Sequence, residues 1–74
     1  MFRASAHAAQ RYQERFVGNV TQEVARQRLE KIAKSCRFKG PLAGGAKLYG
    51  TGDVRIVVRN GTILTTYPAR PRVA

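Results

Sequence analysis

Acidic residues are scarce in this sequence. Four Asp and Glu residues face fourteen Lys and Arg residues, so the formal net charge at pH 7 is +10 in a chain of 74 residues. An excess of this size bears on partners rather than on fold, because it attracts polyanions and acidic surfaces over long range. The shortage of acids therefore favours nucleic acid, or the acidic surface of a protein machine that handles nucleic acid, as the partner.

Cysteine, histidine and long apolar runs are also scarce. Cys36 is the only cysteine and His7 the only histidine, which excludes an internal disulfide and a metal site built from several such ligands. No apolar run approaches the roughly 20 residues that a membrane-spanning helix needs. We therefore expect a monomer in a reducing, cytoplasmic setting, with no cofactor, no metal and no membrane partner.

The clearest structural signal is a hairpin around Asn60-Gly61. Two runs rich in β-branched residues flank this dipeptide, which is typical of a two-residue type I′ turn. Alternation counted outward from the turn would place Val57 opposite Leu64. One face of the hairpin would then be a core wall, made by Val54, Ile56, Val58, Ile63, Thr65 and Tyr67.

The opposite face of the hairpin would be basic and rich in hydroxyl groups, with an apolar centre. Arginines around a buried apolar contact are typical of a protein-binding hot spot. A short turn at residues 50–52 would pair Lys47 with Arg55 and add Lys47 to this face. We predict that this face binds the partner through Lys47, Arg55, Val57, Arg59, Thr62, Leu64 and Thr66, unless a helix or the tail covers it.

Two helices are predicted before the hairpin. Ser5 is a suitable N-cap for a helix over residues 6–16, and Thr21 for a second helix that reaches about residue 35. Basic residues follow the second helix and form a secondary basic patch of Lys31, Lys34, Arg37 and Lys39. This patch is either a solvated helix end or a contact with phosphate or an acidic partner.

These elements predict an α+β domain over residues 1–67, in which two helices pack on a three-stranded antiparallel meander (ααβββ). Residues 37–45, with Gly40-Pro41 and Gly44-Gly45, predict a loop, and residues 46–49 a first short strand. Residues 68–74 predict a basic, proline-containing tail. An alternative arrangement places one helix on each face of the sheet, where a helix would cover Val57 and Leu64.

Two segments, SAHAAQRYQERF at residues 5–16 and RIVVRNGTILTTYP at residues 55–68, resemble domains of the barnase–EndoU–colicin–RelE class. These small phage and bacterial domains carry a helix resembling His-Ala-x-x-Arg-Tyr-x-x-Arg before a small antiparallel sheet that ends in Thr-x-Tyr or Thr-Tyr. Many are metal-independent ribonucleases. The resemblance implies a catalytic set with His7 as general acid or base, Arg11 and Arg15 as phosphate or transition-state stabilisers, and Thr66 and Tyr67 near the scissile phosphate.

Size, charge and composition also resemble the small phage regulators that bind host RNA polymerase. No aromatic pair alternates on the expected open strand face, as a base-stacking platform would require. We therefore predict a non-catalytic transcription regulator that binds the acidic surface of a host nucleic-acid machine in the host cytoplasm. RNA polymerase is the favoured partner. A metal-independent ribonuclease that uses His7 and a non-specific nucleic-acid-binding protein are the alternatives.

Overall fold

The protein folds into a layer of two helices on a five-stranded sheet, in a computed structural model that describes residues 2–70. In chain order the elements are β1 (Arg3–Ala4), α1 (Ala6–Arg15), α2 (Gln22–Ala33), β2 (Arg37–Pro41), the short 3-10 helix η1 (Ala43–Gly45), β3 (Lys47–Thr51), β4 (Val54–Arg59) and β5 (Thr62–Pro68). The strand order is β1-β5-β4-β3-β2, with β1 parallel to β5 and the other pairs antiparallel. The α+β class is confirmed, but the predicted three-stranded antiparallel meander is wrong.

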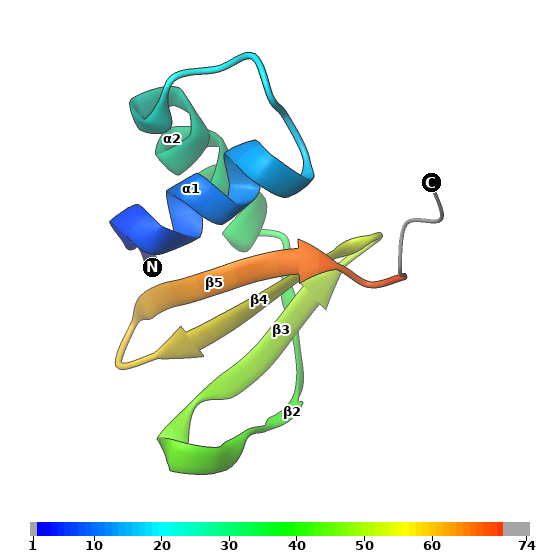
Figure 1. The fold of residues 1–74 in the computed structure, drawn as a ribbon. Helices are drawn as coiled ribbons and strands as arrows, with labels where there is room; N and C mark the ends of the chain where they lie inside the picture. The colour runs from blue at the N-terminus through cyan, green and yellow to red at the C-terminus, as the bar shows by residue number, and fades with distance from the viewer. Residues whose placement is uncertain (1, 71–74) are drawn as a thin grey trace.

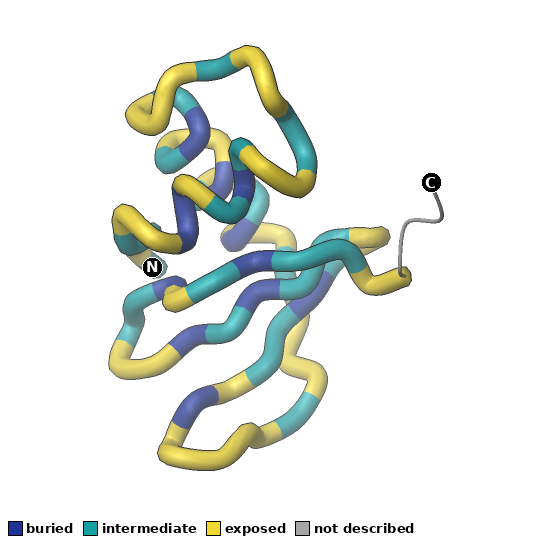
Figure 2. Tube along the Cα trace, in the orientation of Figure 1, coloured by how far each residue is buried: buried dark blue, intermediate teal, exposed yellow. Residues whose placement is uncertain are grey.

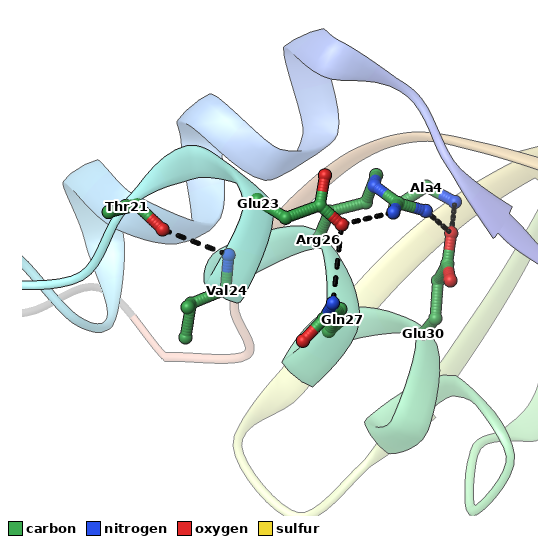
Figure 3. Close-up of polar contacts among 7 residues, drawn as sticks. All are labelled: Ala4, Thr21, Glu23, Val24, Arg26, Gln27 and Glu30. Atoms are coloured by element: carbon green, nitrogen blue, oxygen red, sulfur yellow. Dashed lines mark hydrogen bonds and ion pairs between the residues drawn. The ribbon is translucent and has the colours of Figure 1, made fainter.

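Both helices lie on the same face of the sheet (Figure 1). Each begins at the predicted cap: the Ser5 side chain accepts a hydrogen bond from the Ala8 N–H, and the Thr21 side chain accepts one from the Val24 N–H (Figure 3). Such caps satisfy backbone donors that the first helical turn leaves without partners. Because both helices lie on one face (Figure 1), the alternative arrangement with one helix on each face is wrong.

The core lies between the helix layer and the sheet, where the buried segments of Figure 2 meet. The helices contribute mostly small side chains, so their backbones can lie close to the sheet, while β4 and β5 contribute β-branched residues. The buried core consists of Ala8, Ala9, Tyr12, Ala25, Leu29, Ala33, Ile56, Val58 and Ile63. Burial of Ile56, Val58 and Ile63 confirms these members of the predicted core wall.

The central hairpin has the predicted turn but a different register. Asn60 and Gly61 have φ of 51° and 77°, as a type I′ turn requires, and Arg59 pairs with Thr62. Beyond the next pair the register shifts, so that Val57 pairs with Thr65. Leu64 is the extra residue of a β-bulge. The predicted opposition of Val57 to Leu64 is therefore wrong.

The bulge exchanges the faces of the residues that follow it. Thr66 pairs with Ile56 and is fully buried, and its Oγ1 donates a hydrogen bond of 2.8 Å to the backbone oxygen of Arg55. Tyr67 pairs with Arg55 and so points to the face away from the helices. Thr66 is thus a core residue instead of a partner contact, and the core wall contains neither Tyr67 nor Thr65.

The turn before β4 is also shorter than expected. β3 continues through Gly50 and Thr51, and Thr51 pairs with Val54 across a two-residue loop. This register places Lys47 opposite Val58, on the helix side of the sheet, where it remains exposed. The prediction that Lys47 shares a face with Arg55 is therefore wrong.

Residues 37–41 form the edge strand β2 instead of the predicted loop. Pro41 is acceptable there because an edge strand leaves one side of its backbone without strand partners. A register shift between Phe38 and Gly40 interrupts the pairing, as is common where sheets end. At the other end of the chain, Pro68 still pairs with Val54, and the tail residues 71–74 lie outside the described residues.

Thr66→Val tests the corrected register. Valine fills nearly the same volume but cannot donate to the Arg55 carbonyl, so we expect the free energy of unfolding to fall by about 1 kcal/mol. Thr65→Val, on the opposite face, should change it by less than about 0.5 kcal/mol. Urea unfolding followed by circular dichroism measures both. A larger loss at Thr65 would favour the register without a bulge.

Candidate functional site

The sheet face away from the helices carries three rows of opposed side chains, which we call the open face. From β2 to β5, the first row contains Arg37, Gly50, Arg55 and Tyr67, and the second contains Gly40, Leu48, Val57 and Thr65. The third row crosses from β4 through β5 to β1 and contains Arg59, Thr62 and Arg3. Neither helix covers this face (Figure 1), so four arginines from three strands lie on one surface outside the helix layer.

Acidic side chains are concentrated in the helix layer. Glu14 pairs with Arg11, and Glu23 and Glu30 both pair with Arg26. Hydrogen bonds from Arg11 and Arg26 lower the pKa of Glu14 and Glu23 respectively. Within residues 2–70, none of the four arginines of the open face forms an ion pair with a carboxylate. The open face therefore keeps its positive charge for a partner.

Arg55 is the most constrained arginine of the open face. Its Nη1 donates hydrogen bonds of 3.0 Å to the backbone oxygens of Gly52 and Val54. The side chain lies against Gly50, because a Cβ built on that glycine would be 2.7 Å from both Cδ and Nη1 of Arg55. Gly50 thus makes room for Arg55, although its sequence context indicated only a turn.

An open hollow lies where the open face meets the end of β5. Gly52, Asp53, Arg55, Ala69 and Arg70 line it. The Ala69 N–H donates a 2.7 Å hydrogen bond to the Asp53 backbone oxygen and ties the chain after β5 to the β3–β4 turn. Because the hollow contains an acid as well as two arginines, its charge is less positive than that of the first row.

The predicted partner-binding set is only partly brought together. Arg55, Val57, Arg59 and Thr62 share the open face. Leu64 is 37% exposed at the bulge, whereas Thr66 and Lys47 belong to the helix side, as described above. Sequence reasoning missed Arg3, Leu48, Gly50 and Tyr67.

The structure divides the secondary basic patch between two layers. Lys31 lies in the last turn of α2, and Lys34 caps that helix. Arg37 instead faces Gly50 and belongs to the open face, and Lys39 lies at the irregularity of β2. The strand at residues 37–41 explains the division, because it turns the chain out of the helix layer.

Within residues 2–70, hydrogen bonds join the residues of the ribonuclease resemblance in two separate pairs, His7 with Arg11 and Arg15 with Thr66. His7 is exposed on α1, where its Nε2 accepts a 3.4 Å hydrogen bond from Arg11 Nε. Arg15 donates to the backbone oxygen of Thr66, whose own hydroxyl is buried and used. Tyr67 points to the opposite face. Among residues 2–70, no hydrogen bond joins His7 or Arg11 to Thr66 or Tyr67.

The potential metal ligands of residues 2–70 do not cluster, and the thiol of Cys36 is half-buried. Residues 2–70 contain no group of three or more His, Cys, Asp or Glu side chains that could hold a metal ion. Burial raises the pKa of the Cys36 thiol, although the charge of Arg55 opposes this shift. No helix in these residues is long and apolar enough to cross a membrane.

Comparison with known proteins finds no matching family model, no matching curated protein and no matching solved structure. The resemblances to ribonuclease-like domains and to phage regulators therefore stay predictions. The geometry of the open face is the basis on which a function can be argued.

Proposed function

We propose that the protein is a non-catalytic nucleic-acid-binding protein that holds a strand on its open face. The observation that carries this proposal is the set of four arginines, Arg3, Arg37, Arg55 and Arg59, on one face that neither helix covers, without carboxylate partners among residues 2–70. Guanidinium groups bind phosphate oxygens through charge-assisted hydrogen bonds, and two rows with two arginines each can contact more than one phosphate of a strand.

The bulge at Leu64 supports nucleic acid over a protein hot spot. It makes Tyr67 the cross-strand partner of Arg55 on the open face, and an aromatic side chain in the same row as arginines can stack on a base. It also separates Leu64 from Val57, which the hot-spot prediction had paired as an apolar centre. The open face thus gains an aromatic side chain that a base can stack on and loses the predicted apolar centre that a protein partner would cover.

The salt dependence of binding to a fluorescent RNA oligonucleotide tests this proposal. If four arginines neutralise phosphates of a single strand, the slope of log K against log salt should be about −3. Arg59→Gln should reduce the affinity several-fold and bring the slope closer to zero by about 0.7. Fluorescence anisotropy measures both quantities.

Arg28→Gln is the matched control for this experiment. Arg28 is an exposed arginine on α2, in the helix layer, so the variant loses the same charge at another surface. We expect its salt slope to equal that of the wild type. No binding, or equal losses in the two variants, would contradict an interface on the open face.

A protein partner is the second candidate, because Leu48 and Val57 form an apolar pair at the centre of the open face. In this case an acidic surface of RNA polymerase would cover the pair. Capture of purified polymerase that survives nuclease treatment, and is lost in Val57→Ala, would favour this candidate.

Catalysis would give a different result with the same RNA probe. If the protein cuts the probe in EDTA to 2′,3′-cyclic phosphate ends, and His7→Ala prevents this cleavage, the ribonuclease hypothesis would replace both proposals.

A further inference from the structure

We propose that the first row of the open face is a preorganised binding site, which we call the seat, for one nucleotide of single-stranded nucleic acid. The guanidinium groups of Arg55 and Arg37 would hold the phosphate, and the ring of Tyr67 would stack on the base. This inference rests on the proposed function and deepens it, because it names the form of nucleic acid and the residues that recognise it.

Gly50 is the first argument for a built seat. Glycine in the interior of a strand is unfavourable, because it gains no side-chain packing and loses much backbone freedom. Gly50 has no positive φ that would require glycine, in contrast to Gly52 and Gly61. What its position does require is space for the Arg55 side chain, whose Cδ and Nη1 would each be 2.7 Å from a Cβ on Gly50.

The orientation of Arg55 is the second argument. Both hydrogen bonds of its side chain use Nη1 and end on backbone oxygens. A guanidinium group has five N–H donors. Among residues 2–70, no hydrogen bond uses Nε or Nη2 of Arg55, so these donors can bind a phosphate. Because the side chain is already held over Gly50, less conformational entropy is lost when a ligand binds.

The neighbours of Arg55 define the two ends of the seat. Arg37 faces Gly50 from β2 and is exposed, so the row carries a second arginine on the strand next to Gly50. Tyr67 is on the other side, on β5. Adjacent strands are about 4.8 Å apart, so the row from Gly50 to Tyr67 spans two strand spacings, a length comparable to that of a nucleotide.

A single strand fits this row better than a duplex does. In a duplex the bases are stacked on each other and paired, so that an aromatic ring on a sheet cannot stack on a base unless that base leaves the stack. In a single strand a base can leave the stack and lie on the ring of Tyr67, while its phosphate stays at the guanidinium groups.

Gly50→Ala tests the seat without changing any charge. The added methyl group must displace the flexible side chain of Arg55, so we expect about tenfold weaker binding of a fluorescent ten-nucleotide single strand, in line with the loss of one bidentate arginine contact. Arg55→Gln should weaken binding to a similar extent. The double variant should bind no more weakly than Arg55→Gln, because both changes remove the same interaction.

Gly18→Ala is the matched control. Gly18 lies between α1 and α2, outside the open face, and a Cβ there would meet no atom within 4 Å. Its variant should bind as the wild type does.

Two further comparisons test the stacking of a base on Tyr67. Tyr67→Phe should retain binding, whereas Tyr67→Ala should lose it. A duplex of the same sequence should bind to the wild type at least tenfold more weakly than the single strand.

Different results would overturn the two proposals. If the wild type binds neither single strand nor duplex, the proposed function fails, and the seat fails with it. If the wild type binds with a salt slope that depends on Arg59, but folded Gly50→Ala binds equally well, only the seat is wrong. Additive losses in the double variant, or equal affinity for duplex, would overturn it as well. Should Gly50→Ala not fold, Arg55→Lys decides: it keeps the charge and should still lose the affinity.

Discussion

Ile56→Ala is expected to lower the free energy of unfolding by about 2–4 kcal/mol, the loss typical of a large side chain removed from a closed core. Ile56 is fully buried beneath the helix layer, with Thr66 as its cross-strand partner. Small domains are stable by about 5 kcal/mol or somewhat more, so this variant should be largely unfolded at modest urea concentrations. Urea unfolding followed by circular dichroism gives the midpoint and the slope.

Two further variants keep this prediction testable if Ile56→Ala does not fold. Ile56→Val removes a single methylene group and should lower the free energy of unfolding by about 1 kcal/mol. Val57→Ala affects the next residue of β4, which is only half-buried on the open face, and should cost less than Ile56→Ala. If Val57→Ala proved the more harmful of the two, the open face would be the core face.

Some features of the fold follow from signals only a few residues long. The caps at Ser5 and Thr21 and the turn at Asn60-Gly61 could be predicted, because each depends on the chemistry of its own side chains and on local backbone angles. The burial of Ile56 and Val58 could be predicted too, because both lie close to that turn, where alternation still holds.

The parts that could not be predicted depend on contacts between distant segments. β1 has two residues and no pattern of its own; hydrogen bonds from Arg3 N to Gly61 O (2.9 Å) and from Ser5 N to Ile63 O (3.1 Å) hold it on β5. β2 contains Gly40-Pro41, which is typical of turns and is accepted only because the strand lies at an edge. The bulge at Leu64 has no local signal, and it reverses the face of every later residue in β5.

The candidate site shows the same division. Arg55 and Arg59 could be placed on the open face because alternation along β4 is unbroken. The prediction for Tyr67 gives the wrong face because the sequence does not indicate the bulge. Arg37 is predicted with the basic end of the second helix because the sequence does not indicate β2. Gly50 could not be recognised at all, since its role appears only when the register brings Arg55 beside it.

Glu30 connects the two layers at the edge of the sheet, and we expect its loss to be the second most damaging change. β1 pairs with β5 on one side only, so the Ala4 N–H points away from the sheet. Glu30 Oε2 accepts a hydrogen bond of 2.8 Å from this N–H and one of 3.2 Å from Arg26 Nη1 (Figure 3). The single carboxylate thus satisfies a part-buried backbone donor and an arginine of its own helix.

Glu30→Ala should lower the free energy of unfolding by about 1.5–3 kcal/mol, because it removes a hydrogen bond to a charged acceptor and leaves the Ala4 N–H without a protein partner. Glu30→Gln keeps a neutral acceptor and should lose roughly half as much. Glu23→Ala is the matched control, since Glu23 pairs with the same Arg26 but is exposed and, within residues 2–70, forms hydrogen bonds only to residues of its own helix. It should leave the unfolding midpoint unchanged. Amide hydrogen exchange should show the Ala4 N–H exchanging faster in Glu30→Ala than in Glu23→Ala, and equal protection in the two variants would mean that β1 is held without this carboxylate.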